Sequence, residues 1–328
     1  MSGRRGLVLL AGLVLVAMAL AVLVGETPLR AGDYLTALAR PGSAPGEILW
    51  TIRAPRVVMA ALIGGALGLA GAALQGLLRN PLADPGVLGV SASAGLGAGV
   101  AIALGLAAIP GAIEVAALAG ALVAGALVVT LAARFREPET LILLGVSISA
   151  FAGALSSLVY NFSPSPVTTA EVLSWMLGSV ANRDWPDVVR AALPATLGAL
   201  LVAWSARGLT MLTLGEETAA LSGLPMARLR AAAVGGAALL AGSAVAAAGI
   251  IGFVGLAAPH LVRRWAGDDP GRTLLPSALA GGLLLVLADL AARVIPTEQE
   301  LKLGVVTALF GAPLFALVAW RAARSWRS

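Results

Sequence analysis

The sequence contains no cysteine, a single histidine (His260) and a single lysine (Lys302). The missing cysteines exclude disulfides, thiolate metal sites and thiol nucleophiles, and one histidine excludes a multi-histidine metal site. A P-loop needs Gly-Lys-Ser/Thr to hold nucleotide phosphates, but the lysine lies in Leu-Lys-Leu-Gly. We therefore expect the chain to bind no metal and to lack a P-loop ATP site.

Charged residues are also scarce. They make up 12% of the 328 residues, whereas hydrophobic residues make up 59%. A soluble domain carries roughly 25% charged residues, so the composition indicates a polytopic membrane protein in contact with the lipid bilayer. The net charge of +5 is almost entirely arginine and is interpreted as a topology signal. No basic patch interleaved with aromatic residues is present, and no nucleic acid partner is expected.

Long apolar runs dominate what remains. Residues 7–24 are interpreted as a retained first membrane helix, because a signal peptide has a shorter apolar region of about 7–15 residues. The further candidate spans are 57–78, 87–109, 112–133, 141–160, 188–206, 229–249, 251–263, 274–291 and 303–320. The predicted fold is an all-α polytopic membrane protein of about ten transmembrane helices, with one domain over residues 1–328. The 251–263 span is short enough to be tilted or re-entrant, and 168–180 is predicted to be interfacial or re-entrant.

The arginine distribution predicts the orientation. More arginines fall on the cytoplasmic side when the N-terminus is placed inside than when it is placed outside, so both termini are predicted to be cytoplasmic. The polar stretch 207–230 is then cytoplasmic as well.

Two segments of the chain resemble each other. Residues 63–74 (IGGALGLAGAAL) and 234–245 (VGGAALLAGSAV) match at seven of twelve positions. Under the predicted topology they cross the membrane in opposite directions, which is typical of the inverted repeats of transporters. Chance similarity in a chain rich in alanine and glycine is the alternative.

The stretch 207–230 contains a predicted short helix. Thr213 or Gly215 can cap a helix whose first turn holds Glu216 and Glu217, where acidic groups favour the helix dipole. Gly223 and Pro225 would end it. A rigid helix of this kind could be gripped by a partner outside the membrane, and an ordered loop is the alternative.

The carboxylates lie in loops or near span ends, and Asp289 is the one nearest to the membrane interior. A proton- or sodium-driven carrier usually keeps an acidic residue at depth, so its absence argues against a secondary transporter. A membrane enzyme is disfavoured because no acid pair or Ser/His pair is present at depth. His260 is interpreted as a structural hydrogen-bonding residue. The sequence therefore indicates a transport subunit that a partner drives.

Several motifs in order resemble the FecCD-type permeases, which are membrane subunits of ABC importers for iron-siderophores, haem and cobalamin. The similar stretches are 53–56 (RAPR), 71–91, 175–178 (WMLG), 214–225 (LGEETAALSGLP), 249–260 and 304–313. Ser222 departs from the more usual leucine, and the 297–302 segment also differs from the family pattern.

The resemblance implies an ABC importer type II permease fold in the bacterial inner membrane. It also implies a homodimer, two ATP-binding cassette subunits that use ATP-Mg, and a periplasmic substrate-binding protein. The chain itself is then a transport subunit, not an enzyme, with no cofactor of its own. A ferric siderophore is the preferred substrate, with haem or cobalamin as alternatives, and a partner-independent carrier or channel is the alternative class.

The resemblance also assigns residue roles. The predicted ATPase-coupling helix covers about 214–226, with Leu214, Gly215, Glu216, Glu217, Thr218, Ala219, Ala220, Leu221, Ser222, Gly223, Leu224 and Pro225. Predicted docking residues for the binding protein are Arg53, Arg56 and Arg293, which could instead be arginines that snorkel at the membrane ends. Predicted pathway or gate residues are Asn80, Pro81 and Leu82, with Glu139 and Thr140 as weaker candidates.

Overall fold

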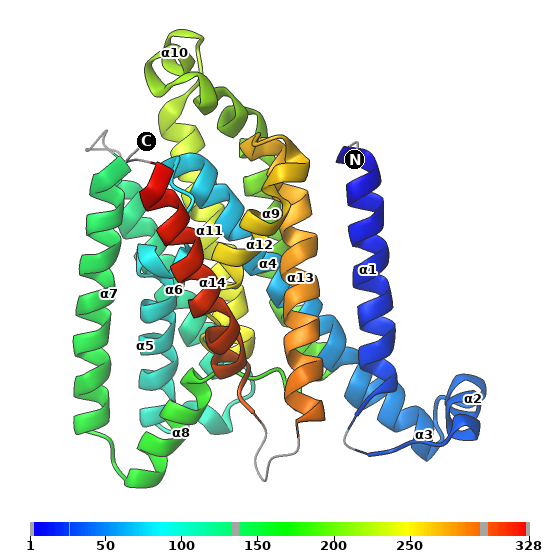
Figure 1. Cartoon of the computed structure of the whole chain (residues 1–328). Coiled ribbons are helices and arrows are strands. Elements are labelled where there is room, and N and C mark those ends of the chain that lie inside the picture. The colour runs from blue at the N-terminus through cyan, green and yellow to red at the C-terminus, as the bar shows by residue number, and fades with distance from the viewer. Residues whose placement is uncertain (1–2, 26, 133–137, 296–300, 326–328) are drawn as a thin grey trace.

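The computed structural model describes residues 3–25, 27–132, 138–295 and 301–325, and these residues form a bundle of helices (Figure 1). Seven helices in this part of the chain are long and apolar enough to cross a membrane. They are α1 (Gly3–Leu23), α4 (Ala54–Leu78), α6 (Ala112–Ala132), α7 (Pro138–Asn161), α9 (Trp185–Met211), α11 (Met226–Ala248) and α13 (Pro270–Val294).

Three further helices occupy the remaining predicted spans: α5 (Val90–Ala103), α12 (Val254–Ala266) and α14 (Leu303–Ser325). The predicted span 87–109 was too long, because Gly89 adopts the left-handed conformation (φ 79°) and the helix begins after it. At 1.5 Å per residue, the 14 residues of α5 and the 13 of α12 fall short of a ~30 Å hydrocarbon core. The prediction that 251–263 is short is confirmed.

Short elements connect the long ones. They are α2 (Ala31–Ala39), α3 (Ala44–Glu47), α8 (Pro166–Met176), α10 (Glu216–Leu221), a π-helical turn η1 (Ile48–Arg53), and the 3₁₀ turns η2 (Pro85–Leu88), η3 (Leu106–Ala108) and η4 (Leu212–Leu214). Helix α8 overlaps the segment 168–180 that was predicted to be too short to span.

Helices α4 and α11 form the centre of the bundle. Most residues of both are buried, and α4 packs against α9, α11, α12 and α13. Glycines permit the close contact between α4 and α13. A Cβ added at Gly64 would collide with the carbonyl oxygen of Gly281, and a Cβ added at Gly281 would collide with that of Gly64. The two resembling segments lie in α4 and α11, which run in opposite directions and are each followed by an irregular segment and a short helix. This arrangement agrees with an inverted repeat.

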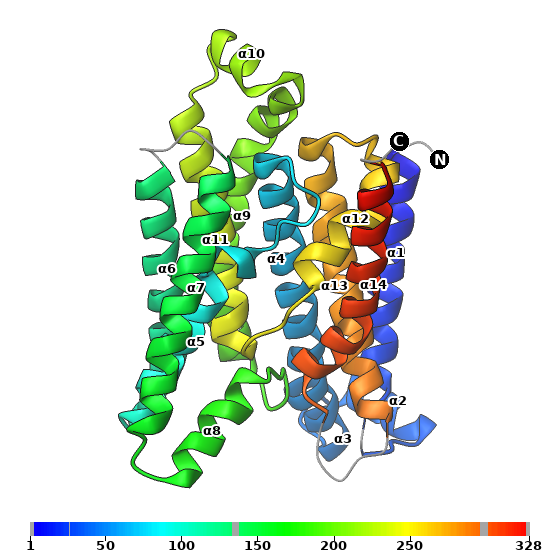
Figure 2. The ribbon, with the colours of Figure 1, turned by 60° about the vertical axis from the view of Figure 1, so that its left-hand side comes forward.

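The two ends of the bundle differ. Helix α10 stands clear of the long helices at the end where α1 begins and α14 ends (Figure 1). Helices α2, α3 and α8 lie at the opposite end, as the turned view in Figure 2 also shows. The predicted coupling residues therefore lie at one end of the bundle, and the predicted docking residues Arg53, Arg56 and Arg293 lie near the other.

Candidate functional site

The predicted coupling element is a short helix between two long ones. Gly215 is the N-cap of α10, with φ 98°, and Glu216 and Glu217 lie in the first turn, as predicted. Thr213 is not the cap, because its hydroxyl donates to the carbonyl oxygen of Thr210 at 2.7 Å. An ion pair between Glu216 and Arg230 ties the start of α10 to α11. At the other end, the Leu224 N–H donates to the Ala219 carbonyl oxygen at 3.2 Å, so the helix is held at both ends.

One face of this element is available to a partner. Ala219 is buried against the rest of the element, whereas Leu214 is 66% exposed and Leu221 is 84% exposed. Gly223 takes a positive φ of 85°, and the chain turns there before α11. Exposed large apolar side chains on a projecting helix are suited to a protein interface.

The element is also fixed to α13. The Thr210 hydroxyl donates to Asp269 Oδ1 at 2.6 Å, and Asp269 accepts from the backbone N–H groups of Gly271 and Arg272 as the N-cap of α13. Burial raises the pKa of Asp269, but these hydrogen bonds and the nearby Arg272 charge outweigh it and hold the pKa below its usual range. A displacement of α10 can thus reach α13 through the end of α9.

The predicted gate residues form a folded loop after α4. Asn80 Oδ1 accepts from the Leu82 N–H at 2.9 Å, and the Ala83 N–H donates to the Asn80 carbonyl oxygen at 3.1 Å. Pro81 lines a cavity of about 240 Å³ that Thr213 and Arg79 also line. The loop therefore shares a cavity with η4, the turn that leads into α10, at one end of the molecule.

Gln75 holds this loop in place, and the sequence analysis did not single it out. It is 4% exposed. Its Nε2 lies 3.3 Å from the Ala83 carbonyl oxygen and 3.5 Å from that of Gly255, while its Oε1 accepts from Arg263 Nη2 at 2.8 Å. One buried amide thus joins α4, the loop and α12. The available signal was a polar residue inside an otherwise apolar run, since buried polar groups need partners.

The weaker gate candidates lie at the start of α7. Thr140 is half-buried there, and the side chain of Glu139 lies outside the described residues. Helix α7 contacts the irregular segment after α4, because a Cβ on Gly145 would collide with the Val87 carbonyl oxygen. The backbone of α7 is therefore close to the predicted gate, and the two side-chain roles stay predictions.

The three predicted docking arginines are not the exposed charges that the sequence analysis assumed. Arg53 is 5% exposed, and the side chains of Arg56 and Arg293 are 12% and 3% exposed. Asp289, 0% exposed, pairs with Arg56 Nη2 and with Arg293 Nη2, each at 2.9 Å. The expectation of free outward charge is corrected, because a buried carboxylate from α13 draws two of them inward.

The same arginines close the end of α1. Arg53 Nη1 donates to the carbonyl oxygens of Val22 and Leu23, and Arg293 Nη1 donates to those of Ala21 and Val24 at 2.9 and 2.8 Å. The last carbonyls of a helix lack partners within it, and cations favour that end of the dipole. Docking by these side chains stays a prediction, and it would require them to exchange the contacts described here.

Comparisons with known proteins agree with this arrangement. The model of the FecCD transport family matches residues 13–321. An uncharacterized ABC transporter permease protein, YvrB of Bacillus subtilis strain 168, is 43% identical over 288 residues, 86% of this chain and 81% of the relative. The vitamin B12 import system permease protein BtuC of Salmonella typhimurium is 39% identical over 325 residues, 98% of this chain and 96% of the relative.

A solved structure shares the whole architecture. It is an inward-facing conformation of a proposed metal-chelate type ABC transporter, with a TM-score of 0.86 and 27% sequence identity, and the match covers 97% of this chain and 99% of that one. Helical architecture, motif order and overall likeness lead to one conclusion: the chain belongs to the FecCD transport family and is a multi-pass membrane permease of an ABC importer.

Proposed function

We propose that this permease imports a metal chelate, and that a corrinoid such as cobalamin is the substrate to test first. The observation that carries the proposal is the likeness to the vitamin B12 permease BtuC, which extends over 98% of the chain. Cobalamin is itself a cobalt chelate, and the metal-chelate type structural neighbour fits the same class. A ferric siderophore, the substrate expected from the motifs, is the second candidate, and haem is the third.

The working assembly in this proposal has several subunits. The permease is a homodimer in the bacterial inner membrane, two ATPase subunits bind on the cytoplasmic side, and a substrate-binding protein docks on the other side. The cytoplasmic side is the one that carries α10 and both termini. The exposed Leu214 and Leu221 and the arginine distribution support this orientation. Only the ATPase subunits use ATP-Mg, and the permease holds no cofactor.

Uptake of labelled substrates tests the proposal. The permease is expressed with its ATPase and binding protein in cells that lack their own importers, and uptake of labelled cobalamin, a ferric siderophore and haem is compared. Cobalamin uptake that needs every subunit supports the first candidate. Uptake of the siderophore alone would identify a ferric siderophore, not cobalamin, as the substrate. Uptake by the permease without the ATPase would contradict the assembly and favour a carrier.

A further inference from the structure

A cavity of about 750 Å³ lies between α6, α9 and α11, at the ends of α6 and α9 that lie away from α10. Its walls are mostly apolar, with Ile109, Val115 and Leu193 among the lining residues. These three are 57%, 69% and 65% exposed, so the apolar wall continues onto the outer surface of the bundle. Helix α9 begins at Trp185, two residues before the lining residue Asp187, and tryptophan is enriched at the headgroup level of membranes. The cavity therefore has the depth and polarity to receive an acyl chain from the bilayer.

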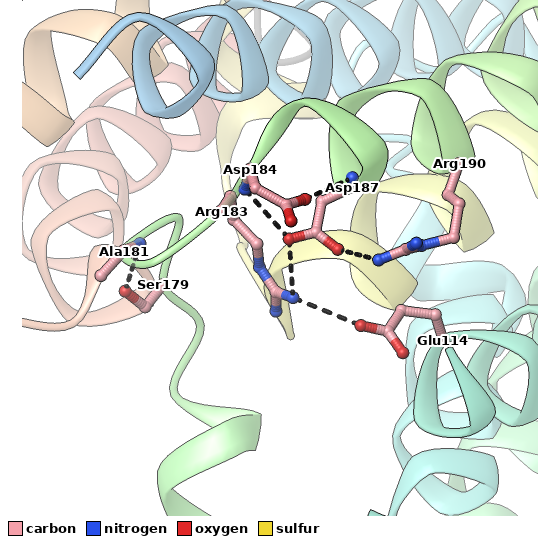
Figure 3. A network of polar contacts seen from close by, with 7 residues as sticks. All are labelled: Glu114, Ser179, Ala181, Arg183, Asp184, Asp187 and Arg190. Atoms are coloured by element: carbon pink, nitrogen blue, oxygen red, sulfur yellow. Dashed lines mark hydrogen bonds and ion pairs between the residues drawn. The ribbon is translucent and has the colours of Figure 1, made fainter. Parts of the chain in front are cut away.

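Four charged side chains line the cavity at the start of α6 and α9. They are Glu114, Arg183, Asp187 and Arg190, and Figure 3 shows how they lie. Arg183 Nη1 lies 3.3 Å from Glu114 Oε1 and 4.0 Å from Asp187 Oδ2, and Arg190 pairs with the same Asp187. These four lining side chains, two arginines and two carboxylates, are neutral as a set, and the exposed Asp184 beside them adds a carboxylate outside the lining (Figure 3). A single anion meets as much repulsion here as attraction, whereas a molecule that carries one positive and one negative charge finds a partner for each.

One donor in this group has no acceptor. The Arg183 Nε is buried and makes no hydrogen bond within the described part of the chain. Leaving a buried donor of a charged group unpaired costs free energy. The Arg183 side chain as a whole is 20% exposed, so a rotation that brings this N–H to an acceptor in the cavity would be stabilising. Arg190, with its side chain 48% exposed, offers further N–H groups at the mouth of the cavity. A phosphate oxygen is an acceptor that both guanidinium groups can use.

We propose that this cavity binds a phospholipid with an ethanolamine headgroup. Its acyl chains lie along the apolar wall between α6 and α9, its phosphate accepts from Arg183 and Arg190, and its ammonium donates to Glu114. The headgroup is neutral overall, as is the side-chain group that receives it. A choline headgroup has the same net charge but no N–H to donate, and a glycerol headgroup leaves the lipid anionic, so both fit less well.

Native mass spectrometry of the full chain in detergent tests the proposal with added phosphatidylethanolamine, phosphatidylcholine and phosphatidylglycerol of identical acyl chains. We expect phosphatidylethanolamine to bind about tenfold more tightly than phosphatidylcholine, as the loss of one hydrogen bond to a charged group implies. Glu114→Gln should remove that preference, and Arg190→Gln should weaken both lipids together. Arg40→Gln, an exposed arginine at the end of α2, is the matched control and should change nothing.

Two further variants keep the proposal open to contradiction. Ala116→Phe fills the cavity without altering charge and should abolish specific retention of all three lipids. Because the chain has no cysteine, Val115→Cys creates a unique thiol on the apolar wall. Efficient disulfide formation between two copies in membranes would overturn the proposal in favour of a subunit interface. Equal retention of the three lipids, strongest retention of phosphatidylglycerol, or an unchanged preference in Glu114→Gln would overturn it as well.

Discussion

At the scale of single residues, Asp289 and Gln75 each join elements that are far apart in the sequence. Asp289 accepts from Arg56, 233 positions away, and pairs with Arg293 one helical turn further on. Gln75 is joined to Arg263, 188 positions away. Neither residue needs to touch a substrate to be important, because each satisfies charges or polar atoms that the fold buries.

Removing the carboxylate of Asp289 should destabilise the chain strongly. Asp289→Asn removes the buried carboxylate with which Arg56 and Arg293 both pair, and breaking a buried pair in this way costs about 3–5 kcal/mol. Thermal unfolding in detergent, followed by tryptophan fluorescence, measures the loss. The exposed Asp268→Asn is the control and should unfold as the wild type does. Equal stability of the two variants would show that the ion pairs of Asp289 contribute nothing, and that the bonds from Arg53 and Arg293 to the carbonyls of α1 hold this end of the bundle.

Two substitutions separate the roles of Gln75. Gln75→Leu removes every hydrogen bond of the side chain and should cost about 1–3 kcal/mol, because buried partners are left unpaired. Gln75→Glu keeps an acceptor for Arg263 but loses the donor to the Ala83 and Gly255 carbonyls. If the bond to Arg263 dominates, Gln75→Glu retains stability and uptake, and Gln75→Leu loses both. A larger loss in Gln75→Glu would instead place the main contribution in the amide donor.

At the scale of elements, the coupling helix α10 is fixed by caps rather than by length. It has six residues, which is too few for a helix to be stable by itself, and its position depends on Gly215, the Glu216–Arg230 ion pair and the buried Ala219. The link from Thr210 to Asp269 extends this anchoring to α13.

Breaking α10 should abolish transport without preventing insertion of the chain into the membrane. Ala220→Pro removes a hydrogen bond inside the helix at a local cost of about 3 kcal/mol, whereas the apolar length of α9 and α11 is untouched. We expect normal membrane levels, lost uptake, and ATPase subunits that co-purify poorly or hydrolyse ATP without transport. Ala220→Ser keeps the backbone N–H at this exposed position and should behave as wild type. Wild-type uptake by Ala220→Pro at equal expression would show that the element is only a loop.

Removing the N-cap of α13 should make the stability of the protein depend differently on pH. Asp269→Ala should lower the stability of the protein by about 1 kcal/mol near neutral pH. The folded-state pKa of Asp269 is depressed, so its contribution is present above the unfolded pKa of about 3.9 and is lost as the pH falls through the folded value. The melting difference from wild type should therefore shrink below about pH 4. A difference that is constant down to pH 3 would assign the effect to packing.

The sequence predicts some of these elements well and others poorly for a physical reason. Apolar length is a local property, so the long helices and the first turn of α10 were predictable. The start of α5 depends on the left-handed Gly89, and the choice of Gly215 over Thr213 as cap depends on which backbone groups the threonine reaches. The pairing of Arg56 with Asp289 joins two helices far apart in the chain, and no local pattern contains it.

At the scale of the whole molecule, the two ends perform different physical tasks. At the end that bears α10, the gate loop, Gln75 and the turn η4 that leads into α10 meet around one cavity, lined in part by Arg79 and Thr213. At the opposite end, buried arginines fix α1 to α4 and α13. Close-packed interiors transmit displacement rather than absorb it. If one end of the permease moves, these buried contacts therefore keep the helices at the other end together.

The energy for transport should come from outside this chain. The purified permease in liposomes should neither hydrolyse ATP nor accumulate the chelate against a gradient, because its sole lysine lies outside any P-loop and the buried carboxylate of Asp289 is already paired with Arg56 and Arg293. Phosphate release and substrate retention are measured with a pH or sodium gradient imposed. Adding the ATPase subunits, ATP-Mg and the binding protein should start accumulation, and a Walker-lysine variant of the ATPase is the control that should not. Accumulation driven by an ion gradient in the permease alone would place the energy coupling within this chain and contradict the proposed assembly.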